Sequence, residues 1–196
     1  MIITGPIESF FKNPKAEPSP EGDGILYHLR RDLEKLYGDE SDNNGDASMH
    51  TMLAIIGMLA GIDYLSKTYS SAEGSRKRFV ETVENLCNMS NDDSEASYLF
   101  RCALVHSVGL STVSNRYRKG TKFNFEVTDD KPVPLIQKLA DASSEVTCRI
   151  SYWELKRAFL KVISEIENIA RELGHPKNSH VINKIGHMHS EKLLKR

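Results

Sequence analysis

One short segment of the sequence, RCALVH (101–106), holds two side chains that can bind and cleave a phosphodiester, Arg101 and His106. An imidazole titrates close to neutral pH, so it can take a proton from a hydroxyl or give one to a leaving oxygen. A guanidinium binds phosphate and the extra negative charge of a transition state. These residue types favour metal-independent cleavage of RNA through attack by its own 2′-hydroxyl, with no cofactor.

The spacing of the two residues indicates that one copy of the segment is not enough for this chemistry. Five positions along a helix separate two side chains by ~140° and ~7.5 Å, so Arg101 and His106 do not share a face. Two copies about a twofold axis would bring both pairs into one cleft. The helix is also apolar on its second side, at Tyr98, Cys102 and Val105, which requires a second cover. We expect a homodimer, although another helix of the same chain would also provide that cover.

A basic segment follows this helix. The stretch from Leu99 to Phe125 contains five basic residues and no acidic one: Arg101, Arg116, Arg118, Lys119 and Lys122. The last four are candidate contacts for an RNA backbone, with Tyr117 and Phe123 available for base stacking. The alternative is an exposed hairpin that binds nothing.

Both Arg101 and His106 also have structural interpretations. Arg101 is a candidate partner for Asp63, which lies in an otherwise apolar segment and needs a partner, and Asp63 would also orient the guanidinium. His106 stands near Gly109, where it would cap the end of a helix and interact with the helix dipole. We assign Asp63 and Cys102 supporting places beside the candidate catalytic pair.

The segment 101–106 fits the Arg-four-residues-His motif of HEPN domains (higher eukaryotes and prokaryotes nucleotide-binding), and the chain resembles that family over roughly residues 24–173. The resemblance implies a compact helical bundle, often a homodimer. It also implies a metal-independent endoribonuclease of a toxin–antitoxin, abortive-infection or CRISPR system, with a cognate antitoxin as a partner. Active members often carry Asn or Asp directly after the Arg, where this chain has Cys102.

The hydrophobic patterning predicts a mainly α fold, a HEPN-like bundle of about five helices with a small β-hairpin after the motif helix. The helices are expected at residues 21–37, 48–69, 75–87, 92–109 and 151–173. In the last of them, Ser151 and Glu154 form a capping box, and apolar residues recur every three or four positions up to Leu173. The segments 111–117 and 122–128 alternate as strands of a hairpin, whereas residues 134–150 combine a short helix with an extended piece.

Three regions are expected along the chain. Residues 1–20 contain four prolines and predict an extended N-terminal arm. Residues 21–174 form the helical bundle domain, in which Gly57 and Gly61 allow a neighbouring backbone to approach closely. Residues 175–196 are a basic C-terminal tail with four histidines, whose spacing fits no zinc site, so no metal is expected.

The composition sets the broad class. A chain of 196 residues with 39% hydrophobic residues suits one domain, and a net charge of −1 gives no overall attraction to nucleic acid. The most apolar run, Met52–Ile62, is far shorter than the ~20 residues that span a bilayer, and the N-terminus lacks the features of a signal peptide. We expect a cytoplasmic protein without membrane contact, whose three cysteines are reduced and buried.

Several functions lack their motifs. The sequence contains no GxxxxGK[ST] loop, no GxGxxG turn and no GxSxG elbow, which argues against nucleotide hydrolysis, dinucleotide chemistry and α/β-hydrolase catalysis. A DNA-binding regulator lacks a basic recognition helix. Two interpretations remain: an endoribonuclease, or a catalytically inactive helical module that binds RNA or a protein partner.

Overall fold

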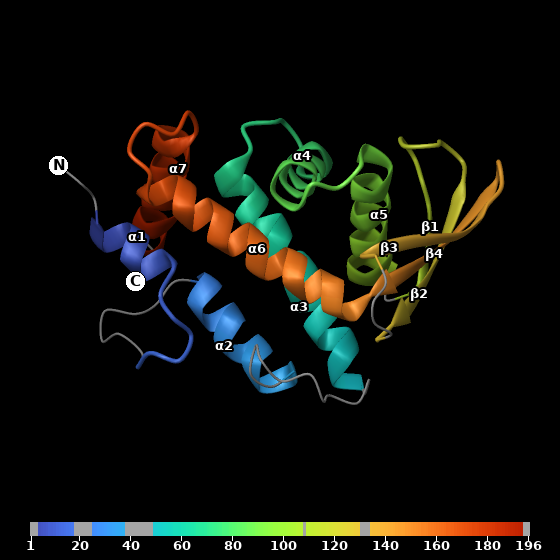
Figure 1. The fold of residues 1–196 in the computed structure, drawn as a ribbon, viewed down its shortest axis with the longest axis horizontal. Helices are drawn as coiled ribbons and strands as arrows, with labels where there is room; N and C mark the ends of the chain where they lie inside the picture. The colour runs from blue at the N-terminus through green and yellow to red at the C-terminus, as the bar shows by residue number, and fades with distance from the viewer. Residues whose placement is uncertain (1–3, 18–24, 38–48, 108, 130–133, 194–196) are drawn as a thin grey trace.

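The computed structural model describes residues 4–17, 25–37, 49–107, 109–129 and 134–193 (Figure 1). Within these residues the chain forms seven helices and one four-stranded sheet. The helices are α1 (Thr4–Phe10), α2 (Ile25–Tyr37), α3 (Met49–Tyr69), α4 (Ser75–Cys87), α5 (Asn91–Ser107), α6 (Tyr152–Arg171) and α7 (Asn178–Leu193). The strands are β1 (Ser111–Val113), β2 (Lys122–Thr128), β3 (Ile136–Asp141) and β4 (Glu145–Ser151).

Helix α3 lies at the centre of the helical body. It packs against α2, α4, α5, α6 and α7, which explains why it is apolar nearly all round. Its two glycines allow the close packing that the sequence predicts. A Cβ atom at Gly61 would lie 2.5 Å from the ring of Phe159 on α6, and one at Gly57 would lie 2.7 Å from Leu33 on α2.

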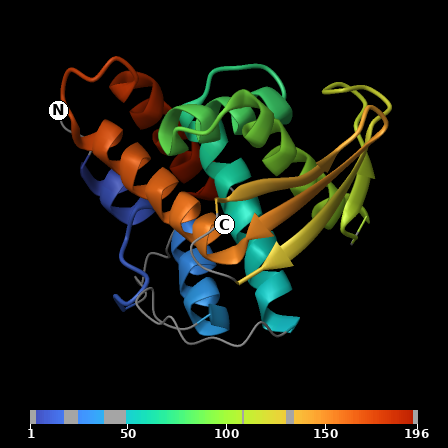
Figure 2. The same cartoon turned by 45° about the vertical axis from the view of Figure 1, so that its right-hand side comes forward.

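The sheet lies at one end of the helical body, beside α5 (Figures 1 and 2). Its strand order is β1-β2-β4-β3; the two outer pairs are antiparallel, and β2 runs parallel to β4. Alternate side chains of the two inner strands are buried in the core, among them Phe125 and Cys148. The ring of Phe125 lies 5.1 Å from that of Phe100 on α5, so the sheet covers a side of this helix.

The predicted fold class, a HEPN-like bundle of about five helices with one small hairpin, is wrong. The sheet has four strands because residues 136–141 and 145–151 form a second hairpin, where we expected a short helix and an extended piece. Only Ile136 of β3 is buried, and the register shifts between Lys138 and Ala140, so this edge strand lacks the alternation that identifies strands. The parallel pairing of β2 with β4 was also not predicted, because turn signals in the sequence identify only antiparallel pairs of consecutive strands.

The two ends of the chain contain helices where we predicted an extended arm and a tail. Residues 4–10 form α1, whose Ile7 and Phe10 are buried in the core. Residues 178–193 form α7, which buries Val181 and Ile185 and packs against α1, α3 and α6. The Asn178 side chain donates hydrogen bonds to two carbonyls at the end of α6, at 2.8 and 3.1 Å, and so fixes the start of α7.

The five predicted helices are present within a few residues of their expected ends. The hydroxyl of Ser151 accepts a hydrogen bond from the backbone amide of Glu154, so the Ser151 half of the predicted capping box is confirmed. The reciprocal half is not formed, because the Ser151 amide donates to the Leu135 carbonyl and the Glu154 carboxylate pairs with Arg157. The expectation for Leu173 is wrong, because α6 ends at Arg171 and the Leu173 side chain is exposed.

Candidate functional site

Arg101 lies on α5 with its guanidinium against α3 rather than in an open cleft. Its Nη2 donates a hydrogen bond to Asp63 Oδ2 at 3.1 Å, and only 14% of each side chain is exposed. Asp63 Oδ1 is buried and accepts no hydrogen bond from the described residues. The predicted pairing of Asp63 with Arg101 is therefore confirmed. Because this pair is largely shielded from water, removing either side chain would leave the charge of the other buried without compensation.

His106 belongs to α5, but its side chain lies outside the described residues. Ala96, Phe100 and Ala103 are buried in the core, and the helix contacts α3, α4 and the sheet of the same chain. Within one chain, α5 thus has cover on more than one side, although Val105 remains 39% exposed.

A cavity of about 470 Å³ lies between the start of α4, the middle of α5 and the β1–β2 hairpin. We call it the α4 cavity. It is lined by Glu73, Gly74, Ser75, Arg76, Lys77, Tyr98, Leu99, Cys102, Thr112, Val113, Ser114, Asn115, Arg116 and Tyr117. Arg116 and Cys102, both expected at a functional site, thus line the same cavity, and Arg101 is the direct neighbour of Cys102.

The first turn of α4 forms one wall of the α4 cavity. Gly74 precedes the helix with a φ of 86°, which a glycine adopts easily, and no side chain caps the amides that follow it. The amides at the start of a helix carry a partial positive charge and bind anions. The cavity therefore contains backbone donors as well as cationic side chains.

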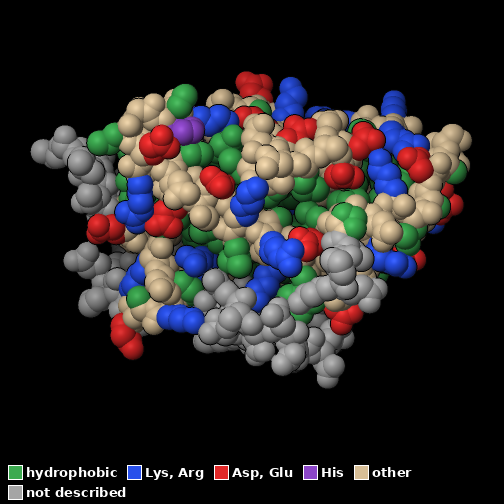
Figure 3. Space-filling view, viewed as in Figure 1, with side chains coloured by type: hydrophobic (Ala, Val, Ile, Leu, Met, Phe, Trp, Pro, Cys, Tyr) green, Lys and Arg blue, Asp and Glu red, His purple; other side chains and the backbone are tan. Residues whose placement is uncertain are grey.

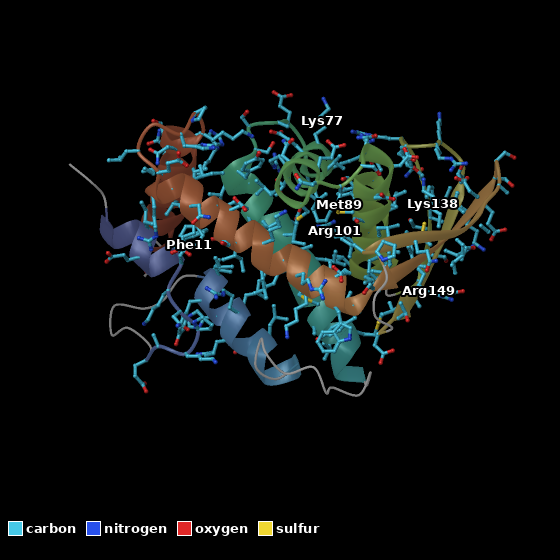
Figure 4. All side chains as sticks on the ribbon, in the orientation of Figure 1. Phe11, Lys77, Met89, Arg101, Lys138 and Arg149 are labelled. Carbon is cyan, nitrogen blue, oxygen red and sulfur yellow. The ribbon has the colours of Figure 1, made fainter. Side chains whose placement is uncertain are left out.

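Two cations of the α4 cavity are available to a ligand. Among the described residues, Lys77 and Arg116 have no carboxylate within ion-pair distance. Arg76 is instead paired with Glu95, to which its Nε donates a hydrogen bond at 2.9 Å. Burial raises the pKa of the Glu95 carboxyl, while the Arg76 guanidinium acts in the opposite direction. Figure 3 shows Lys and Arg side chains, interspersed with Asp and Glu, along the upper edge of the molecule, where Figure 4 labels Lys77.

The two tyrosines of the α4 cavity add aromatic surface. The hydroxyl of Tyr98 lies 3.3 Å from that of Ser75 across the cavity wall. Burial, and then the hydrogen bond to Asp92, raises the pKa of Tyr117 far above its ordinary value. Both residues are half-buried, so part of each side chain is open to a ligand. The prediction that Phe123 stacks on bases is wrong, because this side chain is buried in the core.

The other predicted RNA contacts lie elsewhere on the hairpin. Arg118 forms an ion pair with Asp141 at 2.6 Å, and Lys122 lies 3.6 Å from Glu145. Lys119 is exposed and has no partner in the described part of the chain. Of the four predicted contacts, only Arg116 lines the α4 cavity.

Lys77 and the start of α4 were missed by the sequence analysis. The sequence signal for them is the segment SRKR (75–78), in which three basic residues follow Gly74 and Ser75. It lies more than twenty positions before the basic segment that we singled out, and only the fold brings the two together.

Other features have little bearing on chemistry. All three cysteines are free, but the prediction that all are buried is wrong for Cys87 and Cys102, which are half-buried, and holds for Cys148. Burial raises the pKa of the Cys87 and Cys148 thiols to about 11. In the described ranges, no three His, Cys, Asp or Glu side chains gather as metal ligands. None of the helices in those ranges is both long enough and apolar enough to cross a membrane.

Comparison of the chain with protein-family models, with curated proteins and with solved structures finds no match in any of the three.

Proposed function

We propose that this protein binds single-stranded RNA, with the sugar–phosphate backbone held in the α4 cavity. The observation that carries the proposal is the meeting of Lys77, Arg116 and the uncapped amides of α4 at one cavity. Phosphates are the ligands that such donors select, and they dominate the affinity of nucleic-acid binding.

The shape and lining of the α4 cavity favour one unpaired strand over a duplex. A cavity of about 470 Å³ suits a single nucleotide unit, and the tyrosines beside the cations offer surfaces for base stacking. The hydroxyls of Ser75 and Thr112 at the same cavity are partners for a ribose 2′-hydroxyl, which distinguishes RNA from DNA. Glu73 is the one acid among the described lining residues, so the cations outnumber it.

The test is a fluorescence-anisotropy titration with a 5′-hydroxyl single-stranded RNA of roughly ten nucleotides, the size that one small domain covers. Lys77→Ala/Arg116→Ala should weaken binding roughly tenfold or more, since it removes two charge-assisted hydrogen-bond donors to phosphate. Lys161→Ala/Arg171→Ala removes the same charge from exposed positions of α6 and should bind like the wild type. Equal affinities for all three proteins would refute the proposal, and DNA of the same sequence tests the role of the ribose.

Cleavage of the bound RNA is a second candidate function, carried out by a homodimer through Arg101 and His106. One observation favours it: Tyr98 and Cys102, close neighbours of Arg101 on α5, line the α4 cavity, and the Arg101 guanidinium lies 6.0 Å from the Tyr98 ring. This candidate is the function that the resemblance of residues 101–106 to the HEPN motif implies. The same resemblance implies a cognate antitoxin as a partner.

Cleavage is tested separately from binding. The wild type and His106→Ala are incubated with RNA in the presence of EDTA, and the mass of the protein in solution is measured by light scattering. A ribonuclease of this kind should be a dimer that cuts RNA, whereas His106→Ala should bind without cutting. Intact RNA with the wild type would remove the cleavage candidate and leave the binding proposal standing.

A further inference from the structure

A second cavity, of about 280 Å³, lies beside the connection between α3 and α4. We call it the α7 cavity. The described residues that line it are Lys67, Ser70, Ser71, Ala72, Arg78 and Lys184. Its three cations come from three different helices, α3, α4 and α7, and none of these lining residues is acidic. The cations therefore meet through the fold and not through a basic run of sequence.

The positive charge of the α7 cavity is not balanced within the described parts of the chain. Neither Lys67 nor Lys184 has a carboxylate within ion-pair distance there. One amino nitrogen of Arg78 donates to the Ala72 carbonyl at 3.3 Å, while its buried Nε finds no acceptor among the described residues. A buried donor without an acceptor is costly, and a bound anion would satisfy it.

The acid that lies close to this cavity is already engaged. Glu81 of α4 accepts hydrogen bonds from the Ser70 hydroxyl at 2.5 Å and from Lys177 Nζ at 2.9 Å. Both contacts help to lower the pKa of the Glu81 carboxyl, against the effect of its burial, so it is ionised at neutral pH. Its charge is matched by Lys177, which leaves Lys67, Arg78 and Lys184 in excess.

We propose that the α7 cavity binds a phosphate monoester group, as a dianion. Three converging cations match a doubly charged oxyanion better than a singly charged one. The cavity is about 280 Å³, and no aromatic ring is among its lining residues, so it suits the phosphate group and not a base. Two sources share this chemistry: the 5′-phosphate end of an RNA, and a small phosphorylated molecule.

Binding at this cavity has a structural consequence. Lys184 is on α7, whereas Lys67 and Arg78 are on α3 and α4. A phosphate between them would link α7 to the centre of the helical body. Because the ligand would bind the folded chain and not the unfolded one, it should raise the melting temperature.

The first experiment follows thermal unfolding with inorganic phosphate, against sodium chloride at equal ionic strength. The wild type should gain roughly 3 °C or more once phosphate is well above its Kd. Lys67→Ala/Lys184→Ala changes two exposed side chains, so it should fold normally and lose the gain. The control Lys161→Ala/Arg171→Ala should show the same gain in melting temperature as the wild type. No gain in the wild type, or an equal gain in the Lys67→Ala/Lys184→Ala protein, would overturn the proposal.

The second experiment identifies the source of the phosphate. Phosphoserine and two RNAs that differ only in a 5′-phosphate or 5′-hydroxyl are titrated into the wild type and Lys67→Ala/Lys184→Ala. Tighter binding of the 5′-phosphate RNA by the wild type alone identifies the RNA end, and binding of phosphoserine by the wild type alone identifies a small ligand. If neither difference is seen, the proposal fails. Its failure is distinguishable from that of the RNA proposal, because Lys77→Ala/Arg116→Ala should keep the phosphate response.

Discussion

Arg101 and Arg116 belong to the same basic segment of the sequence, yet the fold gives them opposite surroundings. Arg101 is largely buried and paired with Asp63 of α3, whereas Arg116 is exposed at the α4 cavity with no acidic partner among the described residues. Removing a paired and buried cation destabilises the fold because it leaves its partner's charge uncompensated, whereas an unpaired cation at a cavity is available to an external anion. Under the proposed function, Arg101 therefore serves stability and Arg116 serves binding.

The same contrast holds for larger regions. Around α3 the structure depends on close packing and on one shielded ion pair, and changes there should alter stability without altering the affinity for RNA. Along the edge that carries Lys77, side chains are exposed and changes should have the reverse effect (Figure 4). The predictions that follow test this division, beginning with the largest expected effect.

Arg101→Ala should lower the free energy of unfolding by about 3 kcal/mol, because it leaves Asp63 shielded and without its cation. The measurement is urea denaturation of Arg101→Ala, Asp63→Ala and the double variant. In a double-mutant cycle the double variant should lose less than the sum of the two single losses. A loss below about 0.5 kcal/mol for Arg101→Ala, the range of ordinary surface changes, would contradict the structural role.

Gly61→Ala should cost about 1–3 kcal/mol, because its new methyl group would overlap the Phe159 ring, 2.5 Å away, and Leu29, 2.9 Å away. Gly186→Ala on α7 is the matched control. A Cβ there meets nothing within 4 Å, so the better helix propensity of alanine should make the change neutral or stabilising. Equal melting temperatures for the two variants would show that α3 and α6 are not packed this closely.

Lys77→Ala/Arg116→Ala should leave the free energy of unfolding within about 0.5 kcal/mol of the wild type, since neither side chain has an ion pair to lose among the described residues. The loss should be confined to RNA affinity. Arg101→Ala, studied at a temperature where it is folded, should show the opposite result. If both variants lose stability and affinity together, the proposed division between the two regions is wrong.

The smallest effect concerns pH. Burial, and then Lys184 and Lys177, lower the pKa of His180 below the unfolded value of 6.5, while Glu81 and a backbone contact with Ser70 act in the opposite direction. The unfolded chain thus binds the proton more readily, so this contribution to stability is present above pH 6.5 and is lost as the pH falls through the lowered pKa. Urea denaturation between about pH 7.5 and 5.5 should show this loss, and His180→Gln should reduce it. Lys184→Ala should raise the His180 pKa in an NMR titration, and an unchanged value would exclude Lys184 as a cause.

Hydrophobic periodicity predicted α2 to α6, because each of these helices buries a stripe of apolar residues against the core. It missed α1 and α7, in whose described positions only a few residues are buried, such as Phe10 and Ile185. It also missed β3, since an edge strand with one buried residue has no alternating pattern. The fold class depends on these weak elements and on the parallel pairing of β2 with β4, which is a long-range contact.

The candidate site was predictable only in part. The pairing of Arg101 with Asp63 followed from the cost of an unpaired acid in an apolar helix, and the structure confirms it. The α4 cavity combines residues 73–77, 98–102 and 112–117, three segments whose meeting depends on the tertiary fold. Exposed charged residues follow no hydrophobic pattern that would show which segments meet in the fold. The sequence therefore predicted a basic surface at Arg116 but did not predict that Lys77 lies at the same cavity.

The most direct test of the central claim is the salt dependence of RNA binding by the wild type and by Lys77→Ala/Arg116→Ala. If these two cations bind phosphates of a single strand, the slope of log K against log salt concentration should become shallower by about 1.4, roughly 0.7 for each phosphate that no longer has its cation. Identical slopes for the two proteins would show that the α4 cavity does not hold the RNA backbone.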